Sequence, residues 1–181
     1  TVTTDRGGKA TCKVTVVKKA KKATKVTVKK APKTMNVGDV KQLKVTVKPS
    51  GATDVVTFKS SKKSVISVAK NGVMTANKPG TAKITVKAGK KKATIKVTVK
   101  QPATDITLNK TEVTIKKGKT FKLKATLTPK NSTDKVTYKS SKKNVATVDK
   151  KGVIKAKKKG TTTITVKTAS GKKATCKVTV K

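Results

Sequence analysis

The sequence predicts an all-β protein built from tandem β-sandwich domains. Thr, Val and Lys dominate its 181 residues, whereas aromatic residues make up only 2%. β-branched side chains suit pleated strands better than helices. Apolar and polar residues also alternate with period two, as in 25–29 and 96–100, which is typical of strands with one buried and one solvent-facing side. We therefore expect little or no helix.

Repeated segments divide the chain into units. The segment 58–63 recurs 80 positions later as 138–143, and self-similarity at a fixed spacing indicates structural repeats. The closing segment 93–99 recurs as 174–180, with one residue inserted before it, and it also matches 10–16. The chain therefore contains two full units and part of a third.

These matches define the domain organisation. We interpret residues 1–18 as the C-terminal hairpin of a truncated upstream repeat, followed by one domain at 22–100 and a second at 104–181. Short linkers, 18–22 and 101–103, join the three parts. The length of the chain suits two small domains of this kind.

Each full unit contains short strands separated by turns that carry Gly, Pro, Asn or Asp. Asn71-Gly72 is the strongest short hairpin signal in the chain. Turns at a spacing of about 8 to 12 residues favour a β-sandwich. In the last unit the predicted strands are 105–108, 112–115, 120–128, 135–140, 146–148, 153–157, 162–167 and 173–180.

The order of short motifs is the same in both units. Each unit begins with a Val-x-Val or Ile-x-Leu strand, followed by a Gly, a Pro and Val-Thr-aromatic-x-Ser-Ser. Val-x-x-Val, Gly-Val, Lys-x-Gly-Thr-x-x-Ile-Thr-Val and a terminal Val-Thr-Val come after these. This order resembles the bacterial immunoglobulin-like domains of group 2, which occur as tandem repeats in intimin- and invasin-like adhesins, other bacterial surface proteins and some phage structural proteins. The resemblance implies tandem immunoglobulin-like β-sandwiches at the bacterial cell surface, in an extracellular location. That family commonly has Trp before the Ser-Ser pair, and we expect Phe58 and Tyr138 to fill the same core position here.

Charge is the most unusual feature of the composition. Lys and Arg number 48 against 7 Asp and Glu, a formal net charge of +41, and Arg6 is the only arginine. Such a balance is typical of disordered tails or nucleic-acid binders, but these lysines alternate with Val, Ile and Thr, so we interpret most of them as solvated sheet faces. Base-stacking aromatics and forked arginines are nearly absent, which argues against specific nucleic-acid recognition. No apolar run approaches the ~20 residues of a transmembrane segment, so none is expected.

Catalytic and metal-binding residue types are sparse. The chain has no His, the commonest general base, and its six Asp and Glu112 are scattered singly. Asp54 and Asp134 hold equivalent turn positions, where Asp commonly caps its own backbone; the alternative is a carboxylate pair or a calcium site. The group 2 family shares no catalytic residues, so the resemblance adds none. We expect no enzymatic activity, no metal and no cofactor.

The two cysteines occupy the same position in different repeats. Cys12 and Cys176 correspond to Ile95 in the middle repeat. A position that accepts Ile is a buried strand position, where Cys behaves as a small hydrophobe. We therefore expect two free core thiols, with no disulfide between them because they close different domains.

Two functions fit these features. The first is a non-enzymatic structural, spacer or adhesion segment of a bacterial extracellular surface protein or filament, whose partners are other repeats of the same parent protein through lateral or end-to-end assembly. The alternative is a lysine-rich binding module for anionic glycans, wall polymers or, unspecifically, nucleic acid. Uniform lysine coverage favours the spacer, and one continuous basic stripe favours the module. The candidate polyanion contacts are Lys62, Lys63, Lys142, Lys143, Lys157, Lys158 and Lys159.

Overall fold

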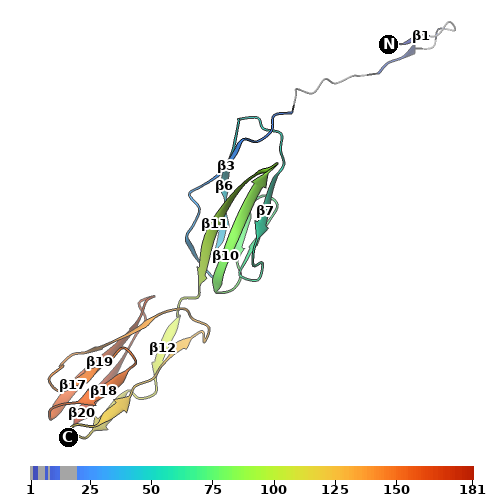
Figure 1. Cartoon of the computed structure of the whole chain (residues 1–181). Helices are drawn as coiled ribbons and strands as arrows, with labels where there is room; N and C mark the ends of the chain where they lie inside the picture. Colours follow the sequence, from blue (N-terminus) through green and yellow to red (C-terminus); the bar gives the residue numbers. More distant parts are fainter. Residues whose placement is uncertain (1, 4–6, 8, 13–19) are drawn as a thin grey trace.

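The computed structural model describes residues 2–3, 7, 9–12 and 20–181 (Figure 1). Strands are the only regular structure in this part of the chain, as the alternating pattern predicts. No helix among the described residues is long and apolar enough to cross a membrane. Most of the strands fall into two β-sandwiches, here called the N-terminal and the C-terminal sandwich.

The N-terminal sandwich has nine strands among the described residues. They are β3 (Lys25–Lys29), β4 (Thr34–Asn36), β5 (Val40–Gln42), β6 (Lys44–Lys48), β7 (Val56–Ser60), β8 (Ile66–Val68), β9 (Val73–Ala76), β10 (Gly80–Ala88) and β11 (Lys91–Lys100). Their sheets have the orders β4-β11-β10-β7, β5-β9-β8 and β3-β6. Only β4 and β11 pair in parallel. The β8–β9 hairpin turns at Asn71-Gly72, as predicted.

The C-terminal sandwich repeats this topology. Its strands are β12 (Asp105–Leu108), β13 (Glu112–Ile115), β14 (Thr120–Lys122), β15 (Ala125–Thr128), β16 (Val136–Ser140), β17 (Ala146–Val148), β18 (Val153–Ala156), β19 (Gly160–Thr168) and β20 (Lys173–Val180). The sheet orders are β13-β20-β19-β16, β14-β18-β17 and β12-β15, with β13 and β20 parallel. Each strand therefore has a counterpart in the N-terminal sandwich.

A short ladder precedes both sandwiches. β1 (Val2–Thr3) pairs antiparallel with β2 (Lys9–Ala10), with Val2 opposite Ala10. Residues 1, 4–6, 8 and 13–18 of the predicted upstream hairpin lie outside the described residues. The closing segment predicted at 10–16 is therefore described only as far as residue 12.

Two separate clusters of buried apolar side chains form the cores. The N-terminal cluster includes Leu43 and Ile84, and the C-terminal cluster includes their counterparts Leu123 and Ile164. Leu123 and Ile164 are completely buried. Burying one such side chain contributes about 1.5–3 kcal/mol, so each sandwich is stabilised by its own core.

The segment 120–128, predicted as one strand, forms two. β14 pairs with β18, and the chain then changes sheets so that β15 pairs with β12. Leu123, between the two strands, is buried, and its N–H donates to the oxygen of Gly152 at 2.9 Å. The apolar positions keep period two through this change of partner, so alternation alone does not reveal it. The positions are Phe121, Leu123, Ala125 and Leu127.

Phe58 and Tyr138 lie at equivalent places, each beside a turn glycine. A Cβ added to Gly72 would lie 2.8 Å from Cζ of Phe58, and one added to Gly152 would lie 2.9 Å from Cζ of Tyr138. Both rings are partly buried and pack against the core of their own sandwich. Burial raises the pKa of the Tyr138 hydroxyl. The two aromatic residues therefore cover the edge of each core.

Candidate functional sites: a linker clamp and a basic end

A loop of the C-terminal sandwich binds the linker that connects the two sandwiches. The N–H of Thr133 donates to the oxygen of Gln101 at 2.8 Å, and the N–H of Gln101 donates to Oγ1 of Thr133 at 3.0 Å. The Ser132 hydroxyl donates to the same Gln101 oxygen at 3.0 Å. Asp134 completes this set, and we call Ser132, Thr133 and Asp134 the linker clamp.

Asp134 joins three segments of the chain. Its Oδ2 accepts the N–H of Ala103 at 3.2 Å and the N–H of Ser170 at 3.0 Å. Hydrogen bonds from Ser170, its side chain first, and from Ala103 lower the pKa of Asp134 against the opposing effect of burial. The prediction that Asp134 caps its own backbone is wrong, because these partners lie 31 and 36 residues away and only folding brings them together.

Two of these contacts recur at the entrance of the N-terminal sandwich. The N–H of Thr53 donates to the oxygen of Lys21 at 2.9 Å, and Oδ2 of Asp54 accepts the N–H of Ala23. Asp54 therefore also binds a segment 31 residues away instead of its own turn. Ala52 stands where the clamp has Ser132, so this entrance lacks the serine hydroxyl.

One peptide group at the junction is bonded to both sandwiches. The oxygen of Lys100, the last residue of β11, accepts the N–H of Val37 at 2.9 Å. The N–H of the same peptide group belongs to Gln101 and is donated to Thr133. A peptide group is planar and resists rotation, so two bonds to its opposite sides restrain the junction.

Two of the predicted lysine loops lie side by side in the C-terminal sandwich. The oxygen of Val145 accepts the N–H of Lys157 at 2.8 Å and that of Lys158 at 3.2 Å. The N–H of Val145 donates to the oxygen of Lys142 at 3.1 Å, and the N–H of Lys142 donates to Oγ1 of Thr162 at 2.9 Å. The predicted contacts that meet here, all exposed, are Lys142, Lys143, Lys157, Lys158 and Lys159.

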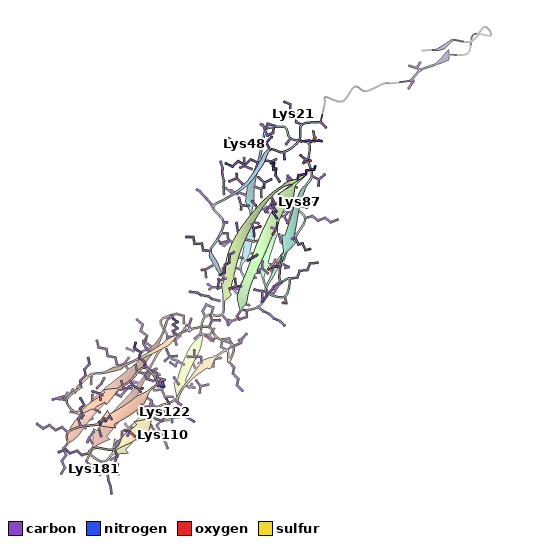
Figure 2. The ribbon with its side chains drawn as sticks, viewed as in Figure 1. Lys21, Lys48, Lys87, Lys110, Lys122 and Lys181 are labelled. Carbon is purple, nitrogen blue, oxygen red and sulfur yellow. The ribbon has the colours of Figure 1, made fainter. Side chains whose placement is uncertain are left out.

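Four further lysines lie at the same end of the C-terminal sandwich, and the sequence did not point to them as polyanion contacts. The N–H of Lys117 donates to the oxygen of Lys181 at 2.8 Å, and the N–H of Ala156 donates to the oxygen of Lys119 at 3.0 Å. Because these segments are far apart in the chain, their proximity has no sequence signal. Lys181 marks this end of the sandwich in Figure 2, away from the linker. We call the following exposed lysines the basic end: Lys116, Lys117, Lys119, Lys142, Lys143, Lys157, Lys158, Lys159 and Lys181.

The equivalent end of the N-terminal sandwich is much less basic. Lys62 and Lys63, the other two predicted contacts, precede Val65, whose oxygen accepts the N–H of Asn77 at 2.9 Å. Lys62 and Lys63 therefore lie on a different sandwich from the other five predicted contacts. Positions that hold lysine in the basic end hold other residues here, namely Asn36, Val37, Asp39, Asn77 and Pro79. Lysines also lie along both sandwiches (Figure 2), so the pattern is general coverage with one dense end.

Asp149, like Asp54 and Asp134, accepts hydrogen bonds from backbone N–H groups. Oδ1 of Asp149 accepts the N–H groups of Lys151 and Val153, both at 2.8 Å. These bonds, that from Val153 first, lower the pKa of Asp149, and they form the turn-capping arrangement expected of Asp54 and Asp134. Among the described residues, no group of three or more His, Cys, Asp and Glu side chains could hold a metal ion.

The two thiols differ in burial. Cys176, opposite Ile164 in the β19–β20 ladder, is free and completely buried, as predicted. Cys12 is free but exposed, so the prediction of a second core thiol is wrong. The reason is that a strand residue is buried only where a second sheet packs against its side of the strand. Cys12 lies outside β1 and β2, and no core cluster of the described residues includes it.

Comparison with known families assigns these repeats. Residues 102–178 match the bacterial Ig-like domain (group 2), and residues 54–101 match the bacterial Ig-like domain. The two matches together cover more than half of the chain. The chain belongs to the bacterial Ig-like domains. Its tandem sandwiches therefore have the immunoglobulin-like fold that the motif order implied.

Known proteins contain similar domains as small parts of longer chains. Kappa-carrageenase of Pseudoalteromonas carrageenovora is 52% identical over 64 residues, which are 35% of this chain and 16% of that protein. The Ig-like virion protein of Serratia phage KSP90 is 45% identical over 80 residues, 42% of this chain and 31% of that protein. Among solved structures, the N-terminal four Ig domains of Dscam1 give a TM-score of 0.53 at 14% identity, covering 91% of this chain and 47% of that one, a likeness of fold alone.

Lysines stand directly opposite one another in the ladders of both Ig-like domains. Like charges in this arrangement destabilise a sheet by roughly 0.2–1 kcal/mol per pair, and compaction of a chain with a net charge of +41 adds to the repulsion. The opposed pairs are Lys25 with Lys48, Lys29 with Lys44, Lys83 with Lys96, Lys87 with Lys92, and Lys167 with Lys173.

Stability is therefore expected to rise with salt. Between about 10 mM and about 150 mM salt the Debye length falls from about 30 Å to about 8 Å. We expect the melting temperature, followed by circular dichroism, to rise by about 5 °C, since about 1 kcal/mol shifts it by about 4–8 °C. A variant with Lys48→Glu, Lys92→Glu and Lys173→Glu, each opposite a lysine, should show a smaller rise. A melting temperature independent of salt would contradict the prediction.

Proposed function

We propose that the two bacterial Ig-like domains form a non-enzymatic spacer in a bacterial extracellular surface protein or filament, and that the spacer holds other parts of the parent protein at a set distance and orientation. The observation that carries this proposal is the Lys100–Gln101 peptide group, bonded to one sandwich through its oxygen and to the other through its N–H. A spacer transmits position only if its joints resist bending. This junction has the bonds to do so.

Repetition of the clamp supports the same function. Thr53 and Asp54 bind the segment that enters the N-terminal sandwich, as Thr133 and Asp134 bind the segment that enters the C-terminal one. These two contacts are therefore a feature of the repeat and not of one junction. Tandem repeats that carry them would be restrained wherever one domain follows another.

The matched relatives support a modular role. The similar segment makes up 16% of a kappa-carrageenase and 31% of an Ig-like virion protein, so related domains accompany very different partners. What these proteins share is the domain and not an activity. This favours a structural or adhesive role for the present domains, with any catalysis of the parent protein residing elsewhere.

Distance measurements between the sandwiches test the proposal. Spin labels are attached at Lys83→Cys on β10 and Lys167→Cys on β19, both exposed positions, in a chain that also carries Cys12→Ser. We expect pulsed electron paramagnetic resonance to give a narrow distance distribution. Thr133→Val with Asp134→Ala should broaden it about twofold, because hydrogen bonds of roughly 0.5–1.5 kcal/mol each are removed from the junction.

The N-terminal clamp provides the matched control. Thr53→Val with Asp54→Ala makes the same substitutions at the other entrance, where the Thr53 hydroxyl donates to the oxygen of Lys21 at 3.4 Å and Asp54 accepts the N–H of Ala23. Both partners precede both labels. This variant should leave the distribution unchanged. An unbroadened distribution after Thr133→Val and Asp134→Ala would remove the support for a rigid spacer.

A further inference from the structure

We propose that the basic end of the C-terminal sandwich binds a linear anionic polysaccharide. This goes beyond the spacer function, because the site lies within one sandwich and uses no residue of the junction. The segments that supply it, 116–119, 142–145, 156–159 and residue 181, contain nine lysines and no acidic residue.

Backbone hydrogen bonds hold these segments in place before any ligand arrives. Thr162, 2% exposed, accepts the N–H of Lys142 at 2.9 Å, and its hydroxyl lies 3.2 Å from that of Ser140 and 3.1 Å from that of Ser141. The N-terminal sandwich has Ala82 in place of Thr162, so it lacks this anchor. Loops that are already ordered lose less conformational freedom on binding, which favours affinity.

The dense positive charge of the basic end favours an anionic partner. Neighbouring strands lie about 4.8 Å apart and packed sheets about 10 Å apart, so lysines on loops joined at one sandwich end lie within a few strand spacings. Their charges repel one another and together raise the local positive potential. A polymer with repeated negative charges relieves the repulsion at several lysines at once, whereas a single small anion meets only one or two.

The residue types favour a polysaccharide over a nucleic acid. The four segments contain no aromatic residue on which a base could stack and no arginine, the residue types that recognise bases. Lysine presents a compact ammonium group with three donors. It binds sulfate or carboxylate oxygens without demanding a fixed geometry, which suits a flexible chain of charged sugars.

Heparin serves as the probe, and two variants of equal net charge serve as the comparison. The basic-end variant replaces lysines that the N-terminal sandwich lacks: Lys116→Gln, Lys117→Gln, Lys157→Gln and Lys159→Gln. The control variant replaces four exposed lysines elsewhere on the same sandwich: Lys110→Gln, Lys130→Gln, Lys135→Gln and Lys172→Gln. All three chains are compared by calorimetric titration at several salt concentrations.

We expect heparin to bind the original chain, and the basic-end variant to bind about tenfold or more weakly at low salt. The slope of log affinity against log salt should fall by about 0.7–0.9 for each lysine–anion pair that the variant removes, a magnitude taken from nucleic-acid binding. The control variant should lose less than about threefold in affinity, since it lowers only the overall positive potential of the protein. Equal weakening in the two variants would overturn the proposal, because binding would then follow net charge alone.

Two further measurements complete the test. On the unmodified chain, amide chemical-shift changes on adding a heparin oligosaccharide should concentrate in 116–119, 142–145 and 156–159, and changes spread over both sandwiches would overturn the site without relying on any variant. A DNA duplex should bind more weakly than heparin of similar charge. Equal or tighter DNA binding, weakened to the same extent in the basic-end variant, would overturn the assignment to a polysaccharide.

Discussion

Gly152→Ala is expected to lower the melting temperature of the C-terminal sandwich by about 15 °C, at about 4–8 °C per kcal/mol. Gly152 has a φ of +81°, and a Cβ built on it would overlap the backbone oxygen of Leu123 and lie 2.9 Å from Cζ of Tyr138. The left-handed backbone costs an L-residue roughly 1–2 kcal/mol, and overpacking costs about 1–3 kcal/mol more. Backbone cannot move aside as a flexible side chain can, so both costs apply.

Gly118 and Gly72 separate these two costs. Gly118 also has a φ of +81°, but nothing lies within 4 Å of its Cβ position, so Gly118→Ala should lower the melting temperature by only about 5 °C, the effect of backbone strain alone. Gly72→Ala meets Phe58 and Gln42 side-chain atoms at 2.8 to 3.2 Å, which can yield, and should destabilise its own sandwich to an intermediate extent.

Tyrosine fluorescence measures the Gly152 and Gly118 effects cleanly. Tyr138 is the only tyrosine and the chain has no Trp, so the emission reports on the C-terminal sandwich alone. Circular dichroism follows the unfolding of both sandwiches, so it is used to measure the melting temperature of Gly72→Ala. Equal shifts for Gly118→Ala and Gly152→Ala would show that the close approach of Leu123 and Tyr138 is unimportant.

Ellman's reagent is expected to modify Cys12 at once and Cys176 at least about a thousandfold more slowly, because native domains are stable by about 5–15 kcal/mol and a buried thiol reacts only after opening. Cys176 is completely buried, and burial first, with the nearby charge of Glu112 second, raises the pKa of its thiol. The reactive thiolate is therefore scarce as well as shielded. Cys12 is exposed.

Two controls assign the phases of this reaction. Cys12→Ser should abolish the fast phase and leave the slow one, and denaturant should make both thiols of the original chain react fast. Two equivalents of fast reaction in the native chain would contradict the burial of Cys176. When the ladder recloses faster than the reagent reacts, the ratio of the slow rate to the rate of the unfolded thiol gives the free energy of opening of the β19–β20 ladder around Cys176.

The fold class and most strands were predictable from the sequence, because strand formation depends on local patterns. Alternating β-branched and lysine residues predicted the strands, and four predicted ranges coincide with β12, β13, β17 and β20. The order of motifs also predicted the family. Alternation missed the change of sheet at Leu123, since a strand keeps its period when its hydrogen-bonding partner changes.

Local residue patterns suffice to show that this chain forms all-β tandem sandwiches with lysine-covered strands, since side-chain direction and turn chemistry are set by neighbouring residues. Which loops meet depends on the tertiary structure. It placed Asp134 against Ala103 and Ser170, joined Lys119 to Ala156, and left Cys12 exposed while burying Cys176. A local pattern says which face of a strand a residue occupies, but a contact between distant segments exists only once the sheets have packed and brought their ends together.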